Sequence, residues 1–170
     1  MKTFIAALFI SLGAVFASPT TNSNSLPALP QQDGLYLGSV DETGQFSWIF
    51  HGKADTQAPA TRDSAPSLAK RSGAHCNGYP AGSVDDINAA VQAIKDGCHE
   101  TQYDKAIAFQ RGGVVAFGCN YGGGQSCNGY EIAPFFTEVA SVCGEGNAGW
   151  YSKSEWAASY GYTRAGNGFC

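Results

Sequence analysis

Apolar residues recur with the period of a helix in two stretches of the C-terminal half of the chain. In the first stretch they are spaced i, i+3, i+4 and i+7, at Ile87, Ala90, Val91 and Ile94. Ser83 is a good N-cap, Asp86 places a carboxylate at the positive end of the helix, and Gly97 ends the pattern. These signals predict a helix from Ser83 to Gly97.

The second helical stretch runs from about Tyr130 to Cys143 and ends at Gly144. Its apolar stripe consists of Ile132, Phe135, Phe136, Val139, Ala140 and Cys143. Pro134 also lies in this stretch. Proline is acceptable only in the first turn of a helix, where backbone N–H groups have no internal partner, so we expect Pro134 to lie there.

Alternating apolar residues between the two helices predict a hairpin. Its strands are the β-prone runs 105–110 and 114–119. Residues 111–113 between them include two glycines, which can take the positive φ that a tight turn requires.

Two other regions also have strand-like patterns. After the second helix, residues 148–152 and 158–163 look extended, with a helical turn at 154–157 between them. Far upstream, residues 34–50 form an apolar island whose two β-prone runs flank Asp41-Glu-Thr-Gly44. We interpret the island as a hairpin, which alone would be only marginally stable in water.

The order strand, helix, strand, strand, helix, strand indicates an α+β fold. The motif Cys76-Asn-Gly-Tyr79 recurs as Cys127-Asn-Gly-Tyr130, each time shortly before a helix that ends at a cysteine. Two split βαβ units would produce this echo. We therefore expect a disulfide-stabilised, ferredoxin-like α/β sandwich with two helices on one face of an antiparallel sheet. A single core is expected to contain Ile87, Val91, Ile94, Ile107, Phe109, Val115, Phe117, Phe135, Phe136 and Val139.

The N-terminal residues have the pattern of a secretory leader. Met1-Lys2 precede an apolar run that extends to Phe16, and a small-x-small cleavage pattern ends at Ala17. The run is too short to span a bilayer, and no later stretch of the chain comes close. Residues 1–17 are therefore predicted to be a signal peptide, and the protein is predicted to be secreted.

Residues 18–71 differ in composition from the rest of the chain, since they hold five of its seven prolines and no cysteine. They end at Lys70-Arg71, a dibasic pair in a context rich in serine, alanine and proline, of the kind that processing proteases cut. This pair lies at the boundary with the half that contains every cysteine. We therefore predict that residues 18–71 are a propeptide and residues 72–170 the mature domain.

The predicted mature domain contains six cysteines: Cys76, Cys98, Cys119, Cys127, Cys143 and Cys170. An even number of cysteines in a small exported domain points to three disulfides. A zinc site is the alternative, but no pair has Cys-x-x-Cys spacing and only His75 and His99 remain as partners. The connectivity stays open. The one pairing we favour is Cys119 with Cys127, because the glycines between them can close a short loop.

Composition and charge narrow the function. The chain has 170 residues, of which 14% are charged, and a formal net charge of −4. This acidic balance argues against a protein that binds nucleic acid by neutralising phosphates, which needs a surplus of lysine and arginine. An electrostatic attachment to an anionic membrane is disfavoured for the same reason, so we expect neither partner.

No catalytic motif is complete. His99-Glu100 lacks the second histidine of the metalloprotease helix, and we interpret the pair as solvated residues after the first helix. No serine lies in a Gly-x-Ser-x-Gly motif, and the glycine-rich loop 122–126 lacks the lysine of a phosphate loop. We expect a protein without catalytic residues, cofactor or metal. The residue types of a ribonuclease are present, although nothing in their spacing assembles them: His75, His99, Glu100, Arg111 and Arg164.

Large aromatic residues are concentrated in the C-terminal third of the chain: Trp150, Tyr151, Trp156, Tyr160 and Tyr162. Such rings are enriched at the hot spots of interfaces, but in a small domain they can equally fill the core. Both interpretations stay open. The candidate partner-binding residues are Trp150, Tyr151, Trp156 and Tyr160.

This layout resembles the fungal small secreted cysteine-rich proteins. The shared features are the leader, the kexin-type site Lys70-Arg71, the six-cysteine domain, and a pro-segment with Asp33-Gly-Leu-Tyr-Leu-Gly-Ser-Val40 followed by Gly44, Trp48 and Gly52. Within that group, the element order is similar to killer-toxin-like α/β-sandwich effectors, including secreted-in-xylem-type avirulence proteins. The resemblance implies virulence or avirulence in a plant host, through binding to a host protein or to a second secreted effector. It supplies no site residues.

We therefore expect a secreted effector that acts by protein–protein contact, outside the fungal cell or after entry into host tissue. A secreted killer-type antimicrobial toxin is the first alternative. It is less favoured because membrane-directed toxins are commonly basic, whereas residues 72–170 contain nine acidic and five basic residues. A small secreted ribonuclease that uses His75 or His99 is the second alternative.

Overall fold

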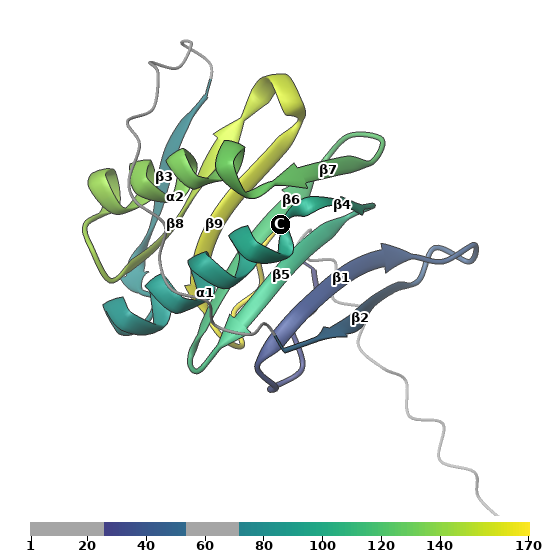
Figure 1. Ribbon diagram of the computed structural model, residues 1–170, viewed down its shortest axis with the longest axis horizontal. Coiled ribbons are helices and arrows are strands. Elements are labelled where there is room, and N and C mark those ends of the chain that lie inside the picture. Colours follow the sequence, from purple (N-terminus) through teal and green to yellow (C-terminus); the bar gives the residue numbers. More distant parts are fainter. Residues whose placement is uncertain (1–25, 54–71) are drawn as a thin grey trace, which may run out of the picture.

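The computed structural model describes residues 26–53 and 72–170 (Figure 1). Ala17, Lys70 and Arg71 lie outside these ranges, so the signal peptide and the dibasic cleavage site stay predictions. The elements in chain order are β1 Gly34–Val40, β2 Phe46–Gly52, β3 Gly73–Pro80, α1 Val84–Gly97, β4 His99–Tyr103, β5 Ala106–Arg111, β6 Val114–Asn120, β7 Gln125–Asn128, α2 Gly129–Cys143, β8 Asn147–Lys153, the short 3₁₀ helix η1 Ser154–Trp156, and β9 Ala158–Arg164.

The two helices lie where the apolar periodicity places them. Ser83 caps α1, because its Oγ accepts a hydrogen bond from the Asp86 backbone N–H at 3.1 Å. Asn128 caps α2 through a hydrogen bond from the Tyr130 N–H to its Oδ1 at 3.0 Å. Because α2 begins at Gly129, Pro134 lies in its second turn, and the expectation of a first-turn position is wrong.

Every pair of neighbouring strands in the main sheet is antiparallel, and the order of its seven strands is β2-β1-β5-β6-β9-β8-β3. A second sheet consists of β4 and β7. The described part of the chain is therefore an α+β fold, and three disulfides stabilise it. The expected ferredoxin-like strand order is not seen. In that fold two split βαβ units interleave, whereas here β3 lies at one edge and β9 is between β6 and β8.

The sequence echo does not mark equivalent positions. Cys76-Asn-Gly-Tyr79 lies within β3 of the main sheet, whereas Cys127-Asn-Gly-Tyr130 spans the end of β7 and the start of α2. One copy is in an edge strand and the other caps a helix, so their shared asparagine and glycine serve different local needs.

Apolar side chains form two clusters instead of the single expected core. The larger cluster contains residues of both helices together with Ile107 and Phe109 of β5. The smaller cluster contains Val115 and Phe117 of β6. Cross-strand partners share a face of a sheet, and Phe117 is opposite Ala108 while Phe109 is opposite Ala116. The two expected halves of one core therefore lie on opposite faces of the sheet.

The disulfides join Cys76 to Cys143, Cys98 to Cys127, and Cys119 to Cys170. All six cysteines are paired, as the sequence predicts, but the favoured Cys119–Cys127 bridge is wrong. The reason is again the face of the sheet. Cys127 belongs to the larger, helix-containing cluster and Cys119 to the smaller one, so their side chains lie on opposite sides despite their proximity in sequence.

Candidate binding surface

The four aromatic residues predicted as partner contacts have different environments. Tyr151 and Tyr160 are buried in the helix-containing cluster, where both stack on Phe135. Their burial favours the core interpretation for these two tyrosines. Trp150 and Trp156 are half-buried, so a contact of either indole with a partner stays a prediction.

The candidate ribonuclease residues are spread over both sheets. His75 is exposed on β3 and its ring stacks on Trp150, with centroids 5.3 Å apart. His99 is in β4 of the small sheet. Arg111 of β5 and Arg164 of β9 are both opposite Val114 of β6, so the two arginines lie at the same end of the main sheet. His75 is opposite Trp150 of β8, and Trp150 is opposite Gly161 of β9. Gly161 precedes Arg164 by three residues, or about 10 Å along the strand. Within the described residues, neither His75 nor His99 has a hydrogen bond or ring contact with an arginine.

The feature that sequence reasoning missed is the place of the N-terminal hairpin. The hairpin itself forms as predicted, from β1 and β2 around the turn 41–45. It does not stand alone, because β1 pairs with β5 over residues 34–38 and 106–110 (Figure 1). Two strands from the predicted propeptide thus extend a sheet whose other strands belong to the predicted mature domain.

Hydrogen bonds fix this pairing at both ends of β5. At one end, the Lys105 N–H donates to the Gly38 carbonyl at 3.2 Å. At the other, the Gly112 N–H in the β5–β6 turn donates to Oδ1 of Asp33 at 2.9 Å. The hairpin is therefore held along the whole length of the strand that it covers.

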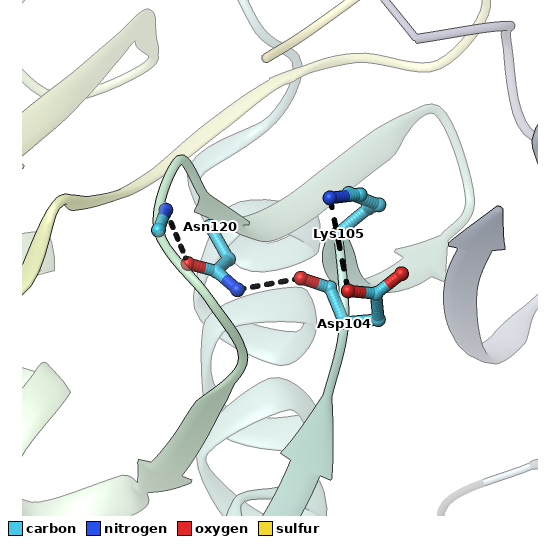
Figure 2. A network of polar contacts seen from close by, with 4 residues as sticks. Asp104, Lys105 and Asn120 are labelled. Carbon is cyan, nitrogen blue, oxygen red and sulfur yellow. Dashed lines mark hydrogen bonds and ion pairs between the residues drawn. The ribbon is translucent and has the colours of Figure 1, made fainter. Parts of the chain in front are cut away.

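A polar network sets the position of Lys105 (Figure 2). The side chain of Asn120 donates to the Asp104 carbonyl at 2.5 Å and accepts from the Gly122 N–H at 2.8 Å. The Asn120 backbone N–H also donates to the Lys105 carbonyl at 2.9 Å, whereas the ion pair between Lys105 and Asp104 is longer, at 3.7 Å. Since Asn120 is buried, this network holds the turn before β5 rigidly. It thereby also fixes the Lys105 N–H, which donates to the Gly38 carbonyl.

The N-terminal residues also cover the smaller apolar cluster. Tyr36, only 2% exposed, and the buried Leu29 pack in this cluster with Phe117 and Phe169. The ring of Trp48 packs against Phe169, with centroids 5.6 Å apart. A predicted propeptide thus supplies a large part of one side of the fold.

Two hydrogen bonds tie the N-terminal stretch before β1 in place. The Leu26 N–H donates to the Phe169 carbonyl at 3.2 Å, and Trp48 Nε1 donates to the Pro27 carbonyl at 2.8 Å. The stretch therefore runs between the hairpin and the C-terminal residues. The hairpin-covered surface is defined as the strand that pairs with β1 together with the apolar residues that the N-terminal stretch and the hairpin cover. These residues are Ala106–Gln110, Val115, Phe117 and Phe169.

The hairpin places one ionisable group, the Tyr36 hydroxyl, against this surface. Burial raises the pKa of the Tyr36 hydroxyl above its ordinary value, and the nearby Asp33 carboxylate adds to the rise. The hydroxyl donates to the Gln32 carbonyl at 2.8 Å and stays protonated at neutral pH. Among residues 26–53 and 72–170, no group of three or more histidine, cysteine or acidic side chains is arranged to hold a metal ion.

One signal in the sequence points to the docked position of β1. Leu35, Tyr36 and Leu37 are consecutive apolar residues, and such runs are typical of strands covered on both faces. In the structure the two leucines pack against the helix-containing cluster, while the tyrosine packs in the smaller one. A free hairpin would have left one of these faces in water.

No protein-family model, curated protein or solved structure matches the chain. Within the described ranges, none of the helices has the length and apolar character needed to cross a membrane.

Proposed function

We propose that this protein is a secreted effector that is processed after Arg71 and acts by binding another protein. The observation that carries the proposal is the hairpin-covered surface. Cleavage at that point would break the covalent link between the strands that cover β5 and the domain that contains β5. Processing would thereby change what the domain can bind, with no catalytic group involved.

The disulfides support the extracellular part of the proposal. Three bridges within residues 76–170 are typical of small domains in oxidising compartments, where cysteines are kept paired. On fold, we propose a variant of the killer-toxin-like α/β sandwich, with both helices on one face and with β9 inserted between β6 and β8. The host range follows from the resemblance: the effector acts in a plant, on a host protein or together with a second secreted effector.

The experiment compares a cleavable and a non-cleavable precursor in plant leaf tissue. The non-cleavable form carries Lys70→Ala with Arg71→Ala, and the matched control carries Arg62→Ala, a basic residue of the same predicted segment. We expect a host response from the wild type and the control, with a secreted species that begins at Ser72, and no response from the non-cleavable form. Equal responses from all three would contradict the role of processing.

A parallel assay separates an effector from a toxin. Purified, processed protein is added to fungal and bacterial cultures at micromolar concentration, and to RNA. We expect no growth inhibition and no RNA degradation. Growth inhibition without any host response would favour the antimicrobial alternative, and RNA degradation abolished by His75→Ala or His99→Ala would favour the ribonuclease.

The half-buried indoles give a second test of the binding mode. We expect Trp150→Ala or Trp156→Ala to weaken the host response while the protein still elutes as a folded, disulfide-bonded species. A variant that unfolds instead would assign its indole to the core.

A further inference from the structure

We propose that the hairpin-covered surface is a strand-binding site, which β1 fills in the precursor and which an extended strand of the partner protein fills after processing. This inference rests on the proposed function, which supplies the cleavage and the partner. It adds where the partner binds, in which conformation, and what keeps the site closed beforehand.

The backbone of β5 requires a second neighbour. Its residues Ala106–Gln110 are all buried and pair with β6 on one side and β1 on the other. Without β1, the N–H and C=O groups along one side of an apolar strand would lose their partners. Such an edge is a template for another strand, and peptide recognition by strand addition uses edges of this kind.

The side chains of β1 indicate the chemistry of the ligand. Leu35 reaches the end of α1 so closely that a Cβ added to Gly97 would be 3.2 Å from its methyl carbons. Leu37 faces the same side, and Tyr36 faces the opposite side, towards Phe117 and Phe169. The site therefore takes an antiparallel strand with the pattern aliphatic, aromatic, aliphatic.

Nothing covalent would hold the hairpin after a cut. All three disulfides join residues of the range 76–170, and residues 26–53 contain no cysteine. Before the cut, the connecting chain gives β1 a high effective concentration at β5, so a competing strand is excluded. After the cut, β1 is an ordinary ligand, and a partner strand competes with it by mass action.

The test measures strand exchange with the full chain. Purified precursor is cut with a kexin-type protease, for which Lys70-Arg71 is the only adjacent pair of basic residues in the sequence. A synthetic peptide of residues 26–53 with a fluorophore at its N-terminus is added in excess. Its uptake is followed by anisotropy, and native mass spectrometry identifies the bound segment. A second precursor, with the recognition sequence of a site-specific viral protease inserted after Ser67, gives a cut that does not depend on the dibasic pair.

We expect the cut protein to take up the labelled peptide and to release its own segment, while the uncut precursor takes up none. Tyr36→Ala or Leu37→Pro in the peptide should weaken uptake roughly tenfold or more, because the first removes a buried ring and the second a backbone donor of a central strand. Ile49→Ala is the matched control, since this side chain on β2 is 50% exposed and its loss should leave uptake unchanged.

Failure of the peptide to enter the cut protein overturns the proposal, whether the resident segment stays bound or leaves. Equal uptake of the Leu37→Pro peptide overturns it as well, as does pairing of two cut domains through β5, seen as a dimer that excludes the peptide. No host component enters this experiment. Strand exchange without a host response would therefore contradict only the proposed function, and a host response without strand exchange only this site.

Discussion

The five strands of the main sheet that lie in residues 72–170 form a set whose two edges are built differently. At one edge, β3 has exposed residues from His75 to Gly78, an interrupted register with β8 before Pro80, and a disulfide to α2 through Cys76–Cys143. At the other, β5 is regular and buried from Ala106 to Gln110, without proline or bulge, and among the described residues β1 is the strand that pairs with its outer side. Proteins protect exposed sheet edges with irregularity, proline and polar side chains. The β3 edge has these features and the β5 edge does not, so β5 depends on a second strand.

The largest expected effect comes from the face next to the β5 edge. Phe117→Ala removes a buried ring that stacks on Phe169 at 4.7 Å, and we expect it to lower the free energy of unfolding by about 3–5 kcal/mol. Urea denaturation of the full chain measures this change. Tyr130→Ala is the control, because its side chain is 85% exposed and its loss should change the free energy of unfolding by less than about 0.5 kcal/mol. Similar losses in both variants would mean that the packing of this face contributes little.

A smaller effect is expected from the β3 edge. Replacing Cys76 and Cys143 together by alanine opens a bridge between residues 67 apart in sequence, and should cost about 2–4 kcal/mol. Hydrogen exchange should then become faster in β3, while the amides of β5 stay protected by β1 and β6. Equal loss of protection at both edges would show that they are not independent.

The buried tyrosines give a matched pair of variants in the core between the edges. The hydroxyls of Tyr103 and Tyr160 are 2.9 Å apart, so Tyr103→Phe leaves a buried hydroxyl without this partner. We expect a loss of about 1–2 kcal/mol. The hydroxyl of Tyr162 has no hydrogen-bond partner within the described ranges, so Tyr162→Phe should be neutral or stabilising. Urea denaturation of both variants tests the difference, and a larger loss for Tyr162→Phe would contradict it.

The same tyrosines set the alkaline limit of stability. Burial raises the pKa of Tyr103, Tyr160 and Tyr162 above the ordinary value of 10.0. The unfolded chain therefore releases these protons at lower pH than the folded chain. Stability should be independent of them below about pH 10 and should fall as the pH rises further. A urea midpoint that is the same at about pH 8 and about pH 11 would contradict this expectation.

The smallest effect is expected at the exposed end of the hairpin. Asp33→Ala removes the acceptor of the Gly112 N–H and should cost a few tenths of a kcal/mol to about 1 kcal/mol, because water can replace the lost bond. Hydrogen exchange at Gly112 should become faster. Asp33→Asn keeps an acceptor oxygen and should retain most of the protection, and equal exchange in both variants would show that this contact is not formed in solution.

Sequence periodicity predicts the elements of this fold much better than their assembly. The α1 cap at Ser83, the end of α2 at Cys143 and the two hairpins depend on neighbouring residues, and their signals are local. The sheet order depends on pairings between distant segments, such as Leu37 with Ile107. Hydrophobic alternation identifies a strand but does not indicate which other strand it pairs with. The same limit explains the error over Cys119, whose partner is 51 residues away on the same face of the sheet.

The candidate surface was harder to predict than the fold because it lies between two parts of the chain. Sequence reasoning selects Trp150 and Tyr151 because they are aromatic, yet Tyr151 is buried in the core. The hairpin-covered surface consists of ordinary core residue types such as Ala108 and Val115, and only the docking of β1 distinguishes them. An apolar run on both faces of β1 is the one local sign that this strand is covered by something outside its own hairpin.

The position of β9 has a consequence for how the chain folds during synthesis. This strand follows every other described strand in the chain, yet it lies inside the sheet, between β6 and β8. Until β9 is in place, no backbone hydrogen bonds link β6 to β8, and the backbone groups on one side of β6 have no partner strand. The N-terminal hairpin is complete long before then and can already cover the far side of β5. Completion of this sheet therefore requires β9 to insert between two strands that precede it in the chain, while the early hairpin protects the far side of β5.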